Sequence, residues 1–262
     1  MRSTFVTTVL VLVLGLTVFA DVTIKQTTSG KGMGMSGTMP GTVRIKGNKM
    51  RSDTTMGDKT QTTIFDLDAQ KMYIFDSKKK EADVWDMAAF ATEISKSVDT
   101  SNAKASFTSN GQTKQIAGYT ADGYEMMISM DAAPGGGKGM QMTATLQGPV
   151  WMVKKAPGAA DYNRFYKAAV EKGWIFTDPR AAKGQPGQAK AMAEMYKQIA
   201  EVGGIAYETG MQIKMGGSGP MAGLFAKLGS MSMSTIVDGV DTGSLSDDLF
   251  APPAGYKLKA KR

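Results

Sequence analysis

Methionine is the most unusual side chain of this sequence, because its abundance and spacing allow three kinds of chemistry. The chain has 21 methionines among its 262 residues. Three pairs of them sit two positions apart: Met33/Met35, Met140/Met142 and Met231/Met233. On a strand, residues two positions apart point to the same face. Such thioethers can fill a core, line a deformable cavity for an apolar ligand, or bind Cu(I) through sulfur.

The cavity interpretation draws on apolar side chains from several predicted strands and one helix. Its candidate residues are Met33, Met35, Phe65, Phe75, Phe90, Ile94, Met126, Met142, Met231 and Met233. The alternative is a Cu(I) site, formed by Met33, Met35, Met231 and Met233. We predict no other metal and no cofactor.

The chain contains neither cysteine nor histidine, which excludes several classes of site. It cannot form disulfides, ordinary zinc sites or a nucleophile activated by histidine. Carboxylates between residues 66 and 86 fall at predicted strand ends and turns, where aspartate favours turn geometry. We therefore predict no catalytic residue, and a protein that is not an enzyme.

The charge balance is basic but weakly patterned. Lys and Arg number 31 against 24 Asp and Glu, so the formal net charge is +7. The basic residues form no stripe interleaved with aromatic residues, and nucleic acid is not an expected partner. A transient attraction to an anionic membrane surface stays open.

Residues 1–20 resemble a targeting segment. Arg2 precedes an apolar run over residues 5–19, and small residues at positions 18 and 20 come just before Asp21. This pattern predicts a cleaved secretory signal peptide; the alternative is an uncleaved membrane anchor. We expect an exported protein, periplasmic or extracellular, that is soluble once processed.

The stretch 41–86 predicts an antiparallel meander. Turns are expected at residues 47–48, 57–58, 68–70 and 77–80, about every ten residues. The strand over residues 49–56 is mostly polar, and we expect it at an edge or facing water. Residues 61–67 and 71–76 carry apolar side chains on both parities, which indicates cover on both faces, by helices on one side and by a bound apolar ligand on the other.

Helical spacing marks three further segments: residues 87–98 after Asp86 as N-cap, residues 161–173 with Asp161 as cap, and residues 188–202 before two glycines. More strands are expected at residues 113–117, 119–130, 140–146, 150–153, 205–215 and 230–240. Residues 100–110 are expected to be a loop, and residues 221–228 a short helix. We expect the basic end, residues 257–262, to be frayed.

The C-terminal residues carry a family resemblance. Leu249-Phe250, followed by Pro-Ala-Gly-Tyr-Lys at residues 253–257, resembles the ending of exported bacterial proteins with the outer-membrane lipoprotein carrier architecture, the LolA/LolB-like fold. Shorter stretches are similar too: residues 47–51, 64–66, 72–76 and 116–119. The sequence looks most like an exported family known only as a domain of unknown function.

The resemblance implies an unclosed, strongly curved antiparallel sheet with helices on its concave side and a cavity for acyl chains between them. The chain departs from the carriers in having no lipoprotein cysteine, long Gly-rich loops and an extra helical region at residues 161–202. No functional residue of the carriers can be matched to a position here.

The sequence thus predicts one α+β domain over residues 21–258, followed by a basic tail at residues 259–262. Its expected architecture is a large curved antiparallel sheet, an unclosed half-barrel, with about three helices packed mainly on the concave face. The predicted function is binding of a hydrophobic ligand, a lipid or a lipoprotein acyl chain. The alternatives are a Cu(I)-binding protein and a structural or interaction protein of the envelope with a filled core and no ligand.

Overall fold

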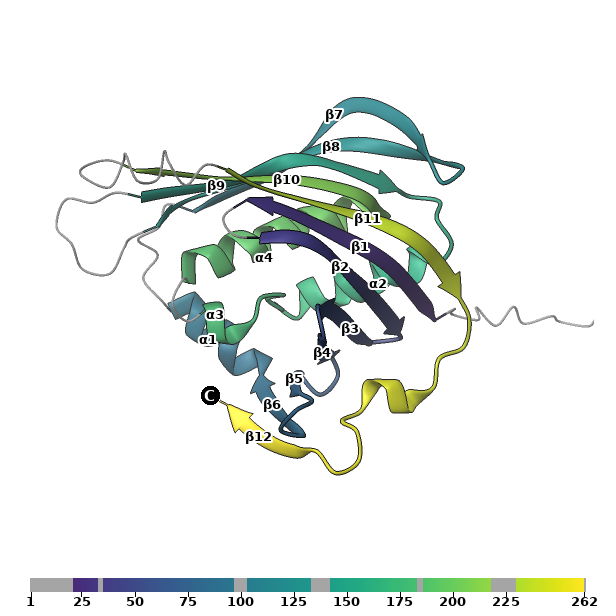
Figure 1. The fold of residues 1–262 in the computed structure, drawn as a ribbon, viewed down its shortest axis with the longest axis vertical. Helices are drawn as coiled ribbons and strands as arrows, with labels where there is room; N and C mark the ends of the chain where they lie inside the picture. Colours follow the sequence, from purple (N-terminus) through teal and green to yellow (C-terminus); the bar gives the residue numbers. More distant parts are fainter. Residues whose placement is uncertain are drawn as a thin grey trace, which may run out of the picture.

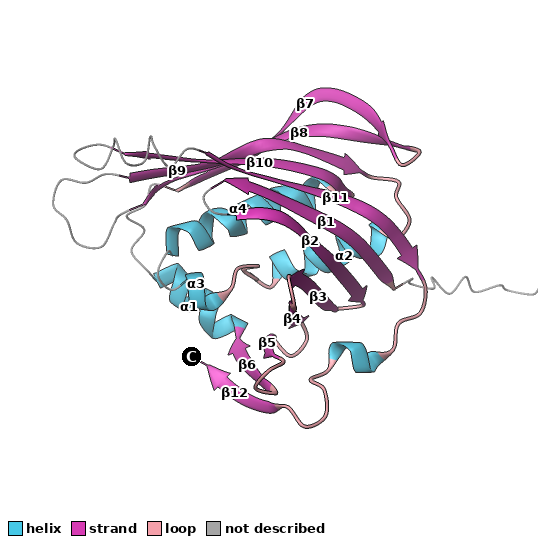
Figure 2. Ribbon diagram, viewed as in Figure 1, coloured by secondary structure: helices cyan, strands magenta, loops and turns pink. Residues whose placement is uncertain are grey.

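The computed structural model describes residues 21–32, 35–96, 103–132, 142–182, 186–217 and 230–261. Within these ranges the protein is α+β: one large, curved and unclosed sheet wraps around helices on its concave side (Figures 1 and 2). The predicted fold class is confirmed. The predicted signal peptide, Met33, Met140 and the expected helix at residues 221–228 lie outside the described residues. None of the described helices is long and apolar enough to span a membrane.

The sheet has 12 strands in the described ranges. The first six are β1 Val22–Gly32, β2 Met35–Lys46, β3 Lys49–Met56, β4 Lys59–Asp66, β5 Lys71–Asp76 and β6 Glu81–Asp86. The others are β7 Lys104–Ile116, β8 Tyr119–Ala132, β9 Met142–Val153, β10 Ile205–Gly217, β11 Ser230–Thr242 and β12 Lys257–Lys261. The helices are α1 Met87–Lys96, α2 Ala159–Glu171, α3 Pro179–Ala182, α4 Pro186–Val202 and the 3-10 helix η1 Asp247–Phe250.

The strand order is β12-β6-β5-β4-β3-β2-β1-β11-β10-β9-β8-β7. The two halves of the chain therefore meet at β1, which pairs with β2 on one side and with β11 on the other. The pairings of the described strands are antiparallel except for β12 with β6. The expected edge position of residues 49–56 was wrong, because β3 lies between β2 and β4; the alternative, a water-facing strand, fits its mostly half-exposed residues.

Local turn chemistry produces the meander as predicted, with one added strand. Gly47 adopts φ 56° in the turn between β2 and β3, a conformation that glycine reaches without strain. The Asp66 and Asp76 carboxylates accept backbone N–H groups of the turns that follow them. The turn at residues 77–80 leads into β6, which the sequence reading missed. Asp86 ends β6 and caps α1, accepting the Ala89 N–H at 2.9 Å, as predicted.

Several expectations for the second half were wrong. Most of the loop expected at residues 100–110 belongs to β7, a polar edge strand. Residues 140–146 and 150–153 do not form separate strands, because β9 runs from Met142 to Val153 through Gly148. Gly158, at φ 71°, precedes α2, and Asp161 lies inside its first turn, paired with Arg164 at 2.8 Å. Residues 257–261 are not frayed but form β12.

Two apolar clusters hold the helices against the sheet. The first joins strands β1–β6 and parts of β8–β11 to helices α1–α4 and the segment after α2, and includes Val22, Ile45, Leu67, Phe165 and Trp174. The second joins β7–β9 to α4, and includes Phe107, Met126, Met152, Ala191 and Met195. Helix α4 packs on β7 and β8 and against α2, and α2 also contacts β2 and β10.

Candidate ligand cavity

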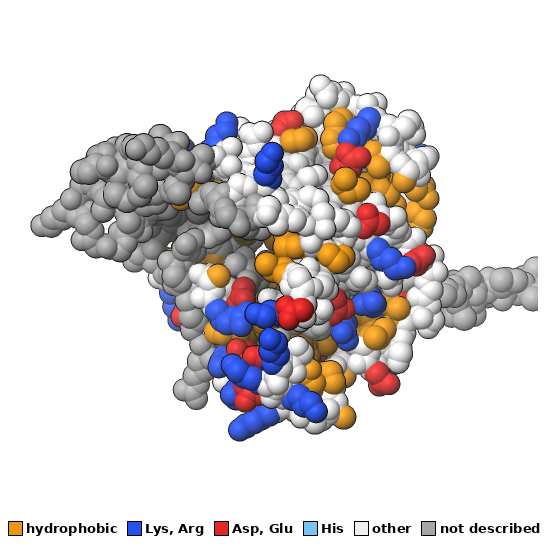
Figure 3. Space-filling view, viewed as in Figure 1, with side chains coloured by type: hydrophobic (Ala, Val, Ile, Leu, Met, Phe, Trp, Pro, Cys, Tyr) orange, Lys and Arg blue, Asp and Glu red, His pale blue; other side chains and the backbone are white. Residues whose placement is uncertain are grey.

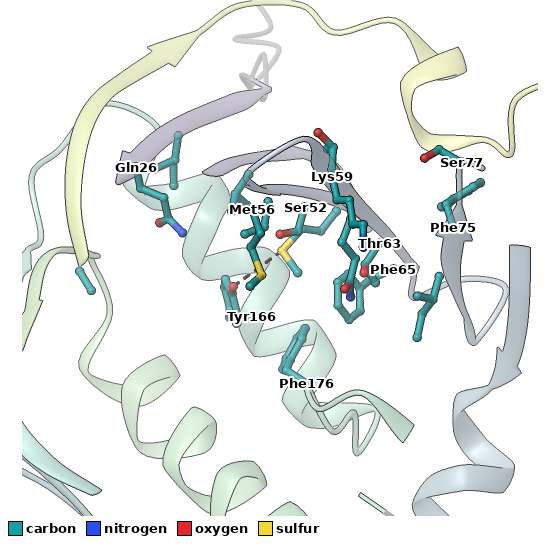
Figure 4. Close-up of a pocket in the computed structure, with 18 of the residues that line it drawn as sticks. Gln26, Ser52, Met56, Lys59, Thr63, Phe65, Phe75, Ser77, Tyr166 and Phe176 are labelled. Atoms are coloured by element: carbon teal, nitrogen blue, oxygen red, sulfur yellow. Dashed lines mark hydrogen bonds between the residues drawn. The ribbon is translucent and has the colours of Figure 1, made fainter. Parts of the chain in front are cut away.

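A cavity of about 1110 Å³ lies between the concave face of the sheet and the helices. Strands β1–β5 form one wall; α2, α4 and the segment between α2 and α3 form the other. Figure 4 shows Tyr166 and Phe176 on the helical side, facing Ser52, Thr63 and Phe65 of the sheet. The volume is at the upper end of the range of ligand pockets, about 300–1,000 Å³.

The inner part of the cavity is mainly apolar, and the half-buried Gln26 of β1 is a polar residue in its lining. The sheet and the start of β10 contribute Ile24, Val43, Met50, Phe65, Ile74, Ile205 and Val237. The helical side contributes four aromatic rings and one aliphatic side chain: Tyr162, Tyr166, Phe176, Tyr196 and Ile199. A ligand in this part would contact hydrocarbon and aromatic faces on both sides.

The outer part of the cavity is polar and exposed. Its rim comes from the β3–β4 turn, the β5–β6 turn and α3: Asp58, Lys59, Thr60, Gln61, Asp76, Ser77, Lys78 and Arg180. Met56 is 59% exposed at the same rim. Between rim and interior lie the small polar side chains Ser52, Thr54 and Thr63. The cavity is therefore amphipathic along its length.

Strand alternation explains how the polar sequence of β3 builds this cavity. Met50, Ser52, Thr54 and Met56 share the parity that faces inward and line the cavity. The alternate residues face outward, where the Asp53 carboxylate accepts hydrogen bonds from Arg44, Arg51 and Thr62 at 2.6–3.1 Å. β3 is polar because one face lines a cavity and the other carries an ion-pair network.

The Asp53 network ties the C-terminal segment to the convex face. Arg51 Nη1 donates to the Leu249 carbonyl at 3.2 Å, and Lys46 Nζ donates to the Leu245 carbonyl at 2.6 Å. Burial raises the pKa of Asp53, but the hydrogen bonds from Arg51 and Thr62 and the nearby positive charges outweigh it, so its pKa is below the ordinary value. Asp53 is therefore ionised at neutral pH, and its carboxylate accepts hydrogen bonds from three side chains.

Three tyrosines stand close together on the helical wall. Tyr162 and Tyr166 have ring centroids 4.6 Å apart, and Tyr166 stacks on Tyr196 at 6.0 Å. The Tyr166 hydroxyl donates to Met50 Sδ at 3.7 Å. Burial raises the pKa of Tyr162 to about 12, raises that of Tyr166 well above its ordinary value, and raises that of Tyr196. All three stay neutral hydrogen-bond donors at physiological pH.

The charges at the rim are partly paired. Arg180 binds both carboxylate oxygens of Asp178, and Lys79 lies 3.4 Å from Asp76. Figure 3 shows Lys and Arg side chains mixed with Asp and Glu over the part of the surface formed by β5, β6 and β12. Lys59 and Lys78 have no ion pair among the described residues, so the rim keeps some free positive charge.

The structure distributes the predicted cavity residues over different places. Phe65 and Phe75 line the cavity, and Phe75 also packs edge-to-face on Tyr256 with centroids 5.6 Å apart. Phe90 and Ile94 are each 2% exposed in the first cluster on α1 and are not among the lining residues. Ligand contact stays a prediction for all of them.

None of the predicted methionines whose side chains are described lines this cavity. Met126 and Met233 line a second cavity of about 570 Å³, together with Met127 and Met211. Met231 lies on β11, opposite Ile213. Met35 and Met142 belong to β2 and β9, but their side chains are outside the description. The Cu(I) site therefore stays a prediction, and the described residues contain no group of three or more Asp or Glu placed to hold a metal.

The sequence reading missed the tyrosines and Phe176 as cavity residues. Tyr162 and Tyr196 do belong to apolar helical stripes that are visible in the sequence, which predicted contact with the sheet. What the stripes do not reveal is that α2 and α4 pack against each other, and that their rings also line the cavity beneath the sheet.

The fold and the cavity define an α+β protein with a half-open sheet and an amphipathic cavity beneath its helices. The chain matches no protein-family model and no curated protein. Among solved structures it is similar to a chain of PNGF-II, with a TM-score of 0.38 and 10% sequence identity, over 92% of this chain and 31% of that one. It thus spans about a third of the PNGF-II chain.

A second solved structure is a domain from Vibrio parahaemolyticus that is assigned to outer membrane lipoprotein sorting. Its TM-score is 0.32 and its sequence identity 9%, over 88% of this chain and 89% of that one. At these scores neither likeness carries an argument about family or ligand.

Proposed function

We propose that the protein is a non-enzymatic binding protein that takes up an apolar or amphipathic molecule, such as a lipid or a lipoprotein acyl chain, between its sheet and its helices. The cavity of about 1110 Å³ is the observation that carries this proposal. The structural alternative expects a filled core, so an interior cavity of this size favours binding. No observation on the described residues favours the Cu(I) alternative.

The lining fits such a ligand energetically. Each methylene buried against the inner wall would contribute about 0.8 kcal/mol. About ten buried methylenes would contribute roughly 8 kcal/mol. That free energy corresponds to micromolar affinity before the entropy cost of ordering the ligand is subtracted. The polar rim would keep a headgroup in water. Export to the periplasm or cell envelope, and transient contact with a membrane surface, belong to the same proposal.

Filling the cavity tests the proposal. Thr63→Trp places a large ring inside the cavity from β4, a position where aromatic residues suit a strand. We expect it to abolish co-purification of lipid, measured by native mass spectrometry, and to weaken binding of the neutral dye N-phenylnaphthylamine at least tenfold.

Thr108→Trp is the matched control, because Thr108 is exposed on the edge strand β7 and does not line the cavity. It should bind lipid and dye like the wild type. Unchanged lipid content and dye affinity in a folded Thr63→Trp variant would contradict the proposal.

A further inference from the structure

The inner end of the cavity contains a polar feature that a purely hydrocarbon ligand would not use. The hydroxyls of Tyr162, Tyr166 and Tyr196 lie among apolar side chains, on α2 and α4, which pack against each other. Their rings keep some accessible surface, and all three residues line the cavity.

Tyr196 differs from its two neighbours in its hydrogen bonding. Tyr166 donates to Met50 Sδ, and side-chain hydrogen bonding between Tyr162 and Tyr166 contributes to the pKa shift of both. Within the described residues, the Tyr196 hydroxyl has no hydrogen-bond partner, and its ring is fixed by Tyr166 and Phe176, with centroids at 6.0 and 4.9 Å. Tyr196 is half-buried and lines the cavity, so its hydroxyl is free to donate to a ligand held there.

We infer that Tyr196 is the anchor of a polar subsite inside the cavity, which accepts an uncharged oxygen acceptor, such as an ester or ketone carbonyl, carried by a long apolar ligand. This inference rests on the proposed function and names its ligand class. The hydroxyl would supply one hydrogen bond to the carbonyl, while the chain of the ligand lies against the apolar wall.

The charge distribution explains why the group must be neutral. The cations that line the cavity, Lys59, Lys78 and Arg180, all belong to the exposed rim, and the inner wall contributes none from the described residues. A carboxylate at Tyr196 would be buried without a counter-charge, which is far more costly than burying a carbonyl that is hydrogen-bonded. A charged headgroup, where the ligand has one, belongs at the rim.

The experiment compares ligands of equal length that differ in the acceptor. The purified protein is loaded with N-phenylnaphthylamine and titrated with methyl laurate, tetradecane or laurate. We expect methyl laurate to displace the dye best. Tyr196→Phe keeps the ring but removes the hydroxyl. It should weaken the binding of methyl laurate by about three- to tenfold, which corresponds to the loss of one hydrogen bond. The affinities for tetradecane and for the dye should be unchanged.

Tyr73→Phe is the matched control, because Tyr73 lies on β5 and is not a lining residue. It should behave like the wild type for all three competitors. If Tyr196→Phe leaves methyl laurate unchanged, or weakens tetradecane equally, the subsite is wrong although the cavity still binds. If laurate is the best competitor and loses most in Tyr196→Phe, a charged group sits there, and the inference is wrong. A wild type that binds no dye would remove the proposed function itself.

Discussion

At the scale of single residues, the two faces of β3 have different roles. Ser52 and Thr54 line the cavity, while Arg51 and Asp53, one position away, hold the convex face to the C-terminal segment. Because the period of a strand is two, neither set can move to the other face without a change of register. The polar composition that made residues 49–56 look like an edge strand is the sum of these two requirements.

Asp53→Asn should destabilise the fold, because it leaves Arg44 and Arg51 partly buried without their carboxylate. We expect the free energy of unfolding at pH 7 to fall by about 1–3 kcal/mol. Asp241→Asn should change it little, because Asp241 pairs with Lys25 on the exposed surface, where a salt bridge contributes below about 1 kcal/mol.

The same substitution predicts a pH dependence. The pKa of Asp53 is lowered in the folded state, so its stabilisation is complete above the ordinary value of 3.8 and is lost as pH falls through the lowered pKa. Urea unfolding of wild type and Asp53→Asn should therefore differ most at neutral pH and converge in acid. A gap that stays constant or widens below pH 3.8 would show that the ionised form is not what stabilises the fold.

At the scale of elements, local signals were read correctly and distant pairings were not. The turn at Gly47, the Asp86 cap and the stripes of α1 and α4 are set by neighbouring residues, and the sequence predicted them. β12 is different: its partner β6 lies far away in the chain, and its order comes from parallel pairing and from ion pairs such as Lys259–Glu81 at 2.6 Å. Three lysines that alternate with Leu258 and Ala260 do not reveal that partner.

The same limit applies to the cavity. Phe65 and Phe75 were found because apolar residues on both parities of a meander predict cover on both faces. Tyr166 and Phe176 could not be found that way, since which wall they form depends on where α2 and α4 cross the sheet. Ligand contact by the methionines stays a prediction, and Met126 and Met233 line the second cavity, not the first.

At the scale of elements, the substitution Gly148→Ala tests why β9 continues as a single strand. It adopts φ 155°, and a Cβ there would lie 2.1 Å from the Gly210 carbonyl oxygen on β10. Gly148→Ala should therefore push β9 and β10 apart and lower the free energy of unfolding by about 1–3 kcal/mol or more. Hydrogen exchange should accelerate at the amides that pair Gln147 with Gln212.

Gly239→Ala is the matched control on β11, because a Cβ there meets nothing within 4 Å and the backbone is not in the left-handed region. It should be neutral or stabilise by up to about 1 kcal/mol. Equal losses from both substitutions would mean that the sheet tolerates glycine loss poorly everywhere, and that the contact with Gly210 has no special role.

At the scale of the whole molecule, one apolar cluster is closed, and the other borders the cavity in which we propose that a ligand binds. The cluster under β7–β9 is closed by α4, whereas α2, α4 and strands β1–β5 enclose the cavity and expose part of their apolar walls to it. Apolar surface that faces a cavity contributes less to stability than packed surface, since it lacks partner atoms on one side. A bound ligand would supply them.

The last prediction follows from that division. Protein stripped of lipid and then given methyl laurate at a hundredfold excess over its Kd should gain about 2.7 kcal/mol of stability. For a chain of this length that gain corresponds to a rise in Tm of roughly 5–10 °C. Thr108→Trp should show the full rise and Thr63→Trp almost none, because only the second substitution occupies the cavity.

Hydrogen exchange shows which elements the bound ligand stabilises. Slower exchange is expected in α2, α4 and β3–β4, which line the cavity, and little change is expected in β7, which contributes no lining residue. Protection spread evenly over both clusters would indicate that the ligand stabilises the protein by binding elsewhere, since a molecule between α2 and the early strands restrains those elements first. The pattern of protection therefore separates a ligand inside the half-barrel from one adsorbed on its surface.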